Sequence, residues 1–177
     1  FIATTIVMII WIIGLSGSGK TTLATAFSNK LRPTIPNLVL LDGDVIRQLY
    51  GNDLGYKETD RVLQIKRIRN LAVFLERQGI LVIVAALYAR DDLLQENRNI
   101  FEKYFEVYLE ADLDLLKTRD TKGLYKKTFN GEMQNVVGVD IPWNAPRNPD
   151  LIFHLSEGMA PEQMVEILFD ALFKGEE

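Results

Sequence analysis

The sequence contains no cysteine and only one histidine in 177 residues. Without cysteine the chain cannot form a disulfide bond, use a thiolate nucleophile or build a cysteine-based metal site. A cytoplasmic location is the plain expectation for such a chain. The single histidine, His154, falls in the apolar segment Leu151–Leu155, so it is predicted to be a structural residue rather than a catalytic base.

The chain also lacks a strong excess of charge and a long apolar run. Its formal net charge is -4 at pH 7, whereas a dedicated nucleic-acid-binding protein usually carries a basic face. The apolar segment Phe1–Ile13 is shorter than the ~20 residues that a membrane-spanning helix needs. We therefore expect neither nucleic acid nor membrane as a partner. The chain begins with Phe1 and has its first methionine at Met8, which leaves open whether residues 1–7 are native.

Segments typical of strands and of helices alternate along the chain. Strands are expected at 7–13, 38–41, 80–87, 105–109 and 151–155, and helices at 20–31, 45–50, 61–78, 93–103, 113–119 and 161–173. This alternation predicts an α/β fold of three layers, a parallel sheet with helices on both faces. Residues 121–148 show no sustained period and are predicted to form a long lid loop. Residues 1–177 are expected to form a single domain.

Ligands of such folds bind where parallel strands end. Three polar segments follow predicted strands: Gly14–Lys20, Asp42–Asp44 and Tyr88–Asp92. We therefore expect the three segments to converge on one crevice.

The first of these segments matches the P-loop pattern, with the sequence Gly-Leu-Ser-Gly-Ser-Gly-Lys-Thr at 14–21. Glycines let backbone N–H groups turn toward a phosphate, the lysine reaches the β- and γ-phosphates, and the hydroxyl can ligate Mg²⁺. A chance glycine-rich turn is disfavoured because the motif lies between a predicted strand and a predicted helix. The predicted ATP-binding residues are Gly14, Leu15, Ser16, Gly17, Ser18, Gly19, Lys20, Thr21 and Thr22.

The second segment is Asp42-Gly43-Asp44. Two carboxylates separated by one glycine can hold Mg²⁺ waters and accept the proton of an acceptor hydroxyl. By itself the segment would be interpreted as a common turn, but it follows a P-loop by one strand–helix unit. Lys20, Asp42 and Asp44 are therefore predicted to be catalytic, with Thr21 and Asp42 as the metal ligands.

Basic residues gather after this turn. Arg47 and Arg61 are predicted to bind an anionic group, because guanidinium pairs with phosphate or sulfate through two hydrogen bonds. The roles of Lys66, Arg67 and Arg69 stay open between ligands and a solvated helix face.

The segment Asp120–Lys127 opens the predicted lid. Its lysines could shield a transferring phosphoryl group from water, and a solvated loop with incidental charge is the alternative. Trp11 and Trp143 are predicted to serve packing.

Together these motifs resemble the adenylylsulfate (APS) kinases, which phosphorylate the ribose 3′-hydroxyl of adenosine 5′-phosphosulfate. The similarity runs from Ile10 to about Ile152. It is carried by Gly-Leu-Ser-Gly-Ser-Gly-Lys-Thr-Thr at 14–22, Leu-Asp-Gly-Asp-Val-Ile-Arg at 41–47, Asp-Leu-Gly-Tyr at 53–56, Asp-Arg at 60–61, Phe-Glu-Val at 105–107, Arg-Asp at 119–120, Lys-Gly-Leu-Tyr-Lys-Lys at 122–127, Gly-Val-Asp at 138–140 and Asn-Pro-Asp at 148–150.

The resemblance implies a nucleotide-kinase-like P-loop fold, ATP and Mg²⁺ as cofactors, a homodimer and a place in sulfate assimilation. It also implies that Asp44 lies near the acceptor hydroxyl and that Arg119 lies by the ATP base. The implied acceptor-binding residues are Asp44, Arg47, Tyr56, Arg61, Gln64, Ala85, Ala86, Lys122, Gly123, Leu124 and Val136.

The chain departs from the family in the acceptor half. Family members carry Ile-Ser-Pro-Tyr-Arg after the third strand, with the serine sometimes described as a phosphorylated intermediate. Here the segment Ala85–Ala89 contains no serine, so direct transfer is expected. Tyr56 matches the first of two aromatic residues that enclose the acceptor adenine, but the second, a lid phenylalanine, is Val136 here. Gln64 stands where asparagine is expected. The departures indicate a divergent branch.

The predicted function is an ATP-dependent kinase acting on the ribose 3′-hydroxyl of a 5′-substituted nucleotide, by default adenylylsulfate. A related kinase acting on another nucleotide, such as cytidine diphosphoramidate in capsule biosynthesis, is the alternative. A P-loop regulatory ATPase or switch is the alternative of another class, although a switch has no evident use for Asp42-Gly-Asp44 and the arginines. The expected partner is a small-molecule nucleotide.

Overall fold

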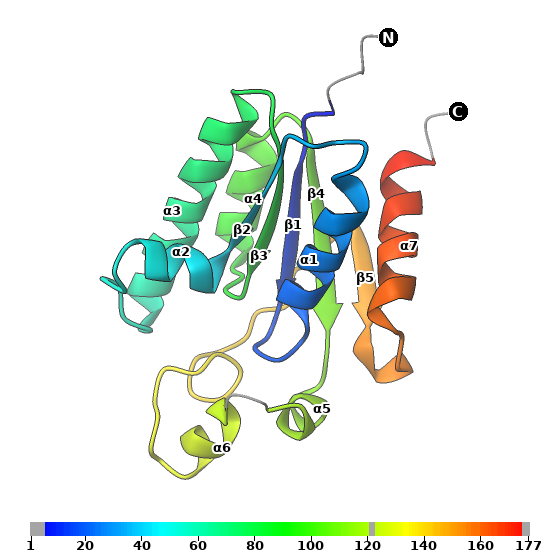
Figure 1. Ribbon diagram of the computed structural model, residues 1–177. Helices are drawn as coiled ribbons and strands as arrows, with labels where there is room; N and C mark the ends of the chain where they lie inside the picture. Colours follow the sequence, from blue (N-terminus) through cyan, green and yellow to red (C-terminus); the bar gives the residue numbers. More distant parts are fainter. Residues whose placement is uncertain (1–5, 121–122, 175–177) are drawn as a thin grey trace, which may run out of the picture.

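The computed structural model describes residues 6–120 and 123–174 and contains one five-stranded sheet (Figure 1). All strand pairs are parallel, in the order β2-β3-β1-β4-β5. The strands are β1 (Ile9–Gly14), β2 (Leu38–Asp42), β3 (Leu81–Ala86), β4 (Tyr104–Glu110) and β5 (Leu151–His154). The predicted parallel sheet is confirmed, and the predicted strand ends differ from these by at most two residues.

Helices connect the strands, as parallel pairing requires. They are α1 (Lys20–Leu31), α2 (Gly43–Leu49), α3 (Glu58–Glu76), α4 (Asp91–Ile100), α5 (Leu113–Thr118), α6 (Leu124–Phe129) and α7 (Pro161–Phe173), with a 3₁₀ turn η1 (Leu155–Glu157). Among these helices of the described residues, none combines the length and apolar character needed to cross a membrane.

Helix α6 corrects the prediction that residues 121–148 form an irregular loop. Six residues are too few to show a hydrophobic period, so the sequence pattern gave no signal for it. The helix is held instead by a side chain that precedes it. The carboxylate of Asp120 accepts hydrogen bonds from the backbone N–H groups of Leu124 (2.8 Å) and Lys126 (3.0 Å).

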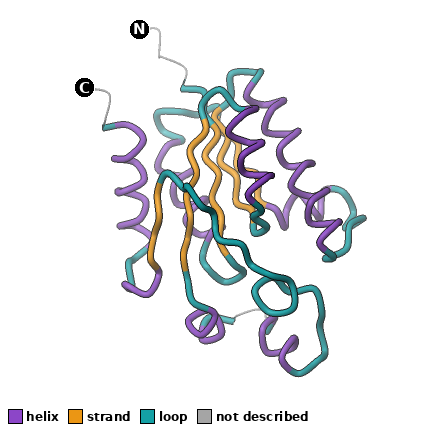
Figure 2. Tube along the Cα trace, turned by 180° about the vertical axis from the view of Figure 1, so that it is seen from behind, coloured by secondary structure: helices purple, strands orange, loops and turns teal. Residues whose placement is uncertain are grey.

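Helices cover both faces of the sheet (Figures 1 and 2), because each face of the central strand is apolar. Side chains alternate between faces along a strand. Ile10 and Ile12 of β1 belong to the core under α1 and α7, while Ile9, Trp11 and Ile13 belong to the core under α3 and α4. All five side chains are fully buried, and β1 is the central strand of the sheet. The predicted three-layer arrangement is confirmed.

The register of the sheet brings the ends of three strands to one edge. Ile12 of β1 and Asp42 of β2 both pair with Ala85 of β3. The chain segments that leave these strands therefore begin side by side. The lid segment with α6 lies beyond this same edge (Figure 1).

Candidate active site

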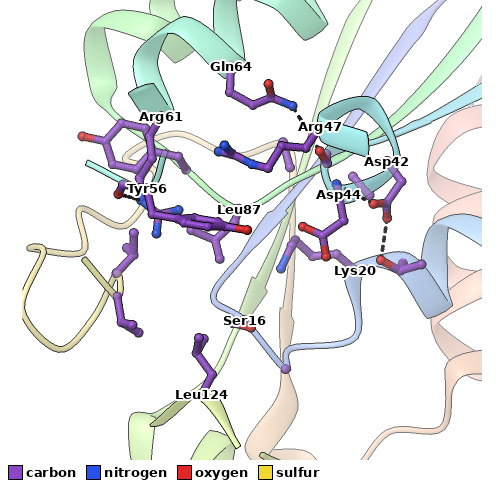
Figure 3. A pocket seen from close by; sticks show the side chains of 18 of the residues that line it. Ser16, Lys20, Asp42, Asp44, Arg47, Tyr56, Arg61, Gln64, Leu87 and Leu124 are labelled. Atoms are coloured by element: carbon purple, nitrogen blue, oxygen red, sulfur yellow. Dashed lines mark hydrogen bonds between the residues drawn. The ribbon is translucent and has the colours of Figure 1, made fainter. Parts of the chain in front are cut away.

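A cavity of about 760 Å³ lies where β1, β2 and β3 end. Its walls come from the P-loop, the Asp42–Asp44 turn, helices α2 and α3, the segment after β3 and lid residues 133–137 (Figure 3). A volume of roughly 300–1,000 Å³ is typical of small-molecule sites. The expected convergence on one crevice is therefore confirmed for the first two polar segments.

The third polar segment reaches the cavity only through Tyr88. Arg90 and Asp92 lie outside it, where the guanidinium pairs with the carboxylate at 2.6 Å at the start of α4. The expectation that all of Tyr88–Asp92 faces the crevice was therefore wrong, because the chain turns away into α4 after Ala89.

The backbone conformation of the P-loop depends on its glycines. Gly17 and Gly19 have φ values of 79° and 89°, a region that residues with a Cβ rarely adopt. A Cβ on Gly14 would lie 2.9 Å from the carbonyl oxygen of Leu109. Ser16, Gly17, Gly19, Lys20, Thr21 and Thr22 line the cavity, whereas Gly14, Leu15 and Ser18 do not.

A single carboxylate joins the P-loop helix to the second strand. Oγ1 of Thr21 donates a hydrogen bond of 2.6 Å to Oδ2 of Asp42. Oδ1 of the same carboxylate accepts the backbone N–H of Asp44 at 2.8 Å and so caps α2. Both metal-ligand candidates are thereby in contact, and both are fixed by elements rather than by a flexible loop.

The Thr21–Asp42 pair fits Mg²⁺ better than it fits a metal ion whose ligands all come from the protein. A hydroxyl and a carboxylate are the hard oxygen donors that Mg²⁺ prefers, and Mg²⁺ usually takes only one or two protein ligands together with waters and substrate phosphates. In the part of the chain that the structure describes, no three His, Cys, Asp or Glu side chains gather as a metal site. Thr21 and Asp42 could thus hold Mg²⁺ only as part of a nucleotide complex.

Lys20 and Asp44 lie next to this contact, on its cavity side (Figure 3). Nζ of Lys20 donates a hydrogen bond of 2.8 Å to the carbonyl oxygen of Leu15, which keeps the side chain over the P-loop. Figure 3 shows Lys20 and Asp44 extending into the same part of the cavity. The three residues predicted to be catalytic therefore lie together.

Arg47 lies across the cavity from the P-loop and is 7% exposed. Its Nη1 donates hydrogen bonds to the carbonyl oxygens of Leu54 (2.9 Å) and Gly55 (2.8 Å). Its Cζ lies 4.6 Å from the ring centroid of Tyr56, within the range of a cation–π contact. The guanidinium is therefore held in place before any ligand arrives.

Arg61 adds a second buried positive charge beside the first and is 9% exposed. Its Nε donates to the carbonyl oxygen of Tyr56 (2.9 Å) and its Nη2 to that of Asn135 in the lid (2.6 Å). Burial, followed by repulsion from Arg47, lowers the pKa of Arg61 from its ordinary value. Two like charges in a partly dehydrated cavity are stabilised by an anion between them.

The other residues implied for the acceptor also meet here. The Gln64 side chain is buried, and its Nε2 donates to the carbonyl oxygen of Gly43 at 3.1 Å. Val136 is 4% exposed and reaches the cavity from the lid. Ala85 and Ala86 form apolar floor between these walls.

The first residues of the lid lie at the P-loop end of the cavity, opposite the two arginines. Arg119, which ends α5, and Leu124 line the cavity, but Gly123 does not. Lys122 lies outside the described residues. The OH of Tyr125 donates a hydrogen bond of 2.8 Å to the carbonyl oxygen of Ser16, which fixes α6 against the P-loop.

Sequence reasoning missed part of the cavity wall. Tyr88 donates a hydrogen bond of 2.7 Å to Glu58, and burial together with that carboxylate raises its pKa to about 12. Ile65 and Ile68 follow Arg61 at helical spacing, so the sequence could have indicated that they line the cavity. No local sequence pattern marks the lid residues as lining it. Gly43 and Tyr88 belong to segments expected at the crevice. The missed lining residues are Gln48, Asn52, Ile65, Ile68, Leu87, Met133, Gln134, Asn135 and Val137.

Lys66, Arg67 and Arg69, whose roles stayed open from the sequence, do not line the cavity. Arg67 pairs with Asp53 at 2.7 Å on the surface. Arg69 is buried against α4, where Nε donates to Asn97 at 2.6 Å and Nη2 to a backbone carbonyl at 2.8 Å. Lys66 faces a separate shallow depression.

The remaining predictions from the sequence concern packing. His154 is half exposed and contacts Glu110 of the neighbouring strand, away from the cavity. Trp11 packs against Phe101 with ring centroids 6.4 Å apart. Trp143 packs against Tyr108 of β4. The packing roles predicted for the two tryptophans are confirmed.

The chain is similar to known proteins over most of its length. Residues 6–154 match the family model described as adenylylsulphate kinase. A cytidine diphosphoramidate kinase of Campylobacter jejuni is 39% identical over 164 residues, which cover 93% of this chain and 95% of that protein. An adenylyl-sulfate kinase of Rippkaea orientalis is 40% identical over 142 residues, which cover 80% of this chain and 78% of that protein.

The fold agrees with a solved relative. The structure of a Mycobacterium tuberculosis APS kinase in complex with AMPPNP and APS superposes with a TM-score of 0.84 at 31% identity. The match covers 93% of this chain and 96% of that one.

Proposed function

The chain belongs to the adenylylsulphate kinase family, and on that basis we propose that it transfers the γ-phosphoryl group of ATP to the ribose 3′-hydroxyl of adenosine 5′-phosphosulfate. One observation carries the proposal. A P-loop whose Thr21 is hydrogen-bonded to Asp42 and a pair of buried arginines, Arg47 and Arg61, face each other across a single cavity. Phosphoryl donor and anionic acceptor would thus meet in one site.

The P-loop half would bind the triphosphate of ATP. Its backbone N–H groups and the N-terminus of α1 favour a phosphate, because both direct partial positive charge at it. The positive charge of Lys20 would stabilise the negative charge on the γ-phosphoryl oxygens during transfer. Mg²⁺, when bound with the nucleotide, supplies charge neutralisation between the β- and γ-phosphates. Thr21 and Asp42 are the residues that would hold it.

The opposite half would bind the acceptor. Arg47 and Arg61 would hold its anionic 5′ group, and Tyr56 would stack on its base. Asp44 would accept the proton of the 3′-hydroxyl while the hydroxyl oxygen forms its bond to the γ-phosphorus and the bond to the ADP oxygen breaks. Since Ala86 provides no nucleophile, transfer would be direct, without a phosphorylated enzyme.

The test is product identification. We expect the protein, ATP and Mg²⁺ to add one phosphate to adenosine 5′-phosphosulfate with release of ADP, as measured by mass spectrometry. A Lys20→Ala variant serves as the matched negative control for a contaminating kinase. Phosphate release from ATP at a rate that no acceptor improves would contradict the proposal and favour a regulatory ATPase.

A second acceptor has specific support. The cytidine diphosphoramidate kinase relative matches more of this chain than the adenylyl-sulfate kinase relative does. Val136 also offers a purine base less stacking surface than the phenylalanine of typical family members would. Comparing kcat/KM for the adenosine and cytidine acceptors decides between the two, and a hundredfold preference for either assigns it.

The family resemblance also supports a homodimer in the cytoplasm as part of this proposal. Sedimentation of the purified chain tests the dimer, which would be about twice the mass of 20.2 kDa that the sequence specifies. A single species at the monomer mass at micromolar concentration would contradict it.

A further inference from the structure

The lid segment Asn135–Ile141 forms a compact turn that reaches the cavity. Val136 and Val137 are 4% and 2% exposed, so the start of the turn is packed inward. Gly138 donates its N–H to the carbonyl oxygen of Ile141 at 2.8 Å, which closes the turn. The turn is therefore a defined structure rather than an open loop.

One carboxylate holds the inward end of this turn. Asp140 accepts the backbone N–H groups of both Asn135 and Val136, one on each oxygen. Asn135 has a φ of 65°, a conformation that is uncommon without glycine and needs support from its surroundings. Asp140 supplies that support from the solvent side, where its own side chain is exposed.

The backbone carbonyl group of Asn135 contacts Arg61, one of the two arginines proposed to bind the acceptor. The carbonyl oxygen of Asn135 accepts the 2.6 Å hydrogen bond from Nη2 of Arg61. Asp140, Asn135 and Arg61 therefore form a chain of contacts from the outer surface of the lid to the cavity.

We propose that Asp140 is a positioning residue for the acceptor: by fixing the Asn135–Val136 backbone it aims the Asn135 carbonyl at Arg61 and the Val136 side chain into the cavity. This inference rests on the function proposed above and adds a residue that does not itself touch either nucleotide. The carboxylate is the suited group, because one amide or hydroxyl side chain cannot accept two backbone N–H groups on two separate oxygens.

Electrostatics agree with this geometry. Desolvation raises the pKa of Asp140, but the backbone hydrogen bonds from Asn135 and Val136, with a smaller attraction to Arg61, outweigh it and leave the pKa below its ordinary value. The carboxylate is thus charged at neutral pH, which is the form that accepts both hydrogen bonds.

The expected consequence is a selective loss of acceptor binding. ATP contacts the P-loop half, which Asp140 does not touch, so removing the carboxylate should leave the KM for ATP within about twofold. The KM for the acceptor should rise about tenfold in Asp140→Ala, the size of one lost charge-assisted hydrogen bond. Asp140→Asn, which keeps one acceptor oxygen, should show a smaller rise.

Glu132 provides the matched control. It is also an exposed lid carboxylate, but within residues 6–120 and 123–174 it accepts a hydrogen bond only from the side chain of Asn130, at 3.2 Å, and it does not line the cavity. Glu132→Ala should leave both KM values unchanged. Equal rises of both KM values in Asp140→Ala, or an acceptor KM unchanged within twofold, would overturn the proposal.

A second readout does not depend on catalysis. Backbone amide hydrogen exchange at Asn135 and Val136, measured by NMR on the nucleotide-free protein, should be at least tenfold faster in Asp140→Ala than in the wild type and unchanged in Glu132→Ala. Exchange that stays at the wild-type rate would refute the positioning role. If exchange is faster in Asp140→Ala but the wild type phosphorylates no acceptor, the proposed function fails while the structural assignment of Asp140 stands.

Discussion

The two halves of the cavity are built in different ways. The P-loop half comes from two short segments, 14–22 and 42–44. Its shape depends mainly on the backbone conformation of the glycines and on the Thr21–Asp42 hydrogen bond. The acceptor half draws on α2, α3, the segment after β3 and the lid. Arg47 and Nε of Arg61 are held by carbonyl oxygens nearby in the sequence, but Nη2 of Arg61 is held by that of Asn135, 74 residues further along the chain. A local motif can encode the first half, whereas the second exists only after the chain has folded.

This difference suggests how the halves can change independently. The P-loop half has the residues for which we propose a role in phosphoryl transfer. The acceptor half has Val136, Gln64 and Ala86 at the positions where the family resemblance leads us to expect other residues. Substitutions in the P-loop half should therefore affect turnover for every acceptor, while substitutions in the acceptor half should change which acceptor is used.

The largest effect is expected at the P-loop. Lys20→Ala should lower kcat by roughly 10²–10³-fold with either acceptor, because one preorganised charge at the transferring phosphoryl group is lost. The fold should survive, since the side chain faces the cavity, and circular dichroism checks this. Steady-state turnover near the wild-type value would show that the P-loop is not the donor site.

Asp44 lies at the boundary between the halves. Asp44→Asn keeps the size of the side chain but removes its ability to accept a proton, so kcat should fall about 100-fold. The affinity for ATP, measured by calorimetry, should change little. A collapse of ATP affinity with normal residual kcat would instead make Asp44 a structural residue of the nucleotide site.

A substitution confined to the acceptor half should spare ATP. Arg61→Lys keeps the charge but cannot donate to Tyr56 and Asn135 through two separate nitrogens of a planar group. The acceptor KM should rise about tenfold, and the ATP KM should stay within about twofold. Lys66→Arg is the control on the same helix, since Lys66 faces a separate depression and its replacement should leave both constants unchanged. Parallel rises in both KM values for Arg61→Lys would remove the separation between the halves.

The smallest expected effect concerns the base. Stacking on an aromatic ring contributes ~1–3 kcal/mol, so Val136→Phe should raise kcat/KM for adenosine 5′-phosphosulfate by about five- to tenfold. It should not raise kcat/KM for a cytidine acceptor equally, because the bulkier side chain would fit the smaller base less well. If the wild type already has a micromolar KM for adenosine 5′-phosphosulfate and Val136→Phe gives no gain, Val136 does not face the base.

The difference between local motifs and contacts formed only on folding also explains how much of the fold and the site could be predicted from the sequence. Apolar segments predicted all five strands: β1 and β3 are buried along their whole length, and the edge strands β2 and β5 are still mostly apolar in sequence. The glycine spacing of 14–19 predicted the P-loop. Helix α6 was missed because its support is the Asp120 side chain rather than a periodic face. Asn135 and Asp140 were missed as parts of the site because their importance comes from one long-range contact, to Arg61, that no local pattern encodes.

The central claim, that both halves serve one transfer reaction, is tested most directly by following the γ-phosphate of labelled ATP in a single turnover with and without adenosine 5′-phosphosulfate. The account predicts that the label appears at the 3′ position of the acceptor, one per ADP formed, that almost none is released without acceptor, and that no labelled protein accumulates. Label that leaves as inorganic phosphate at the same rate in both reactions would contradict it.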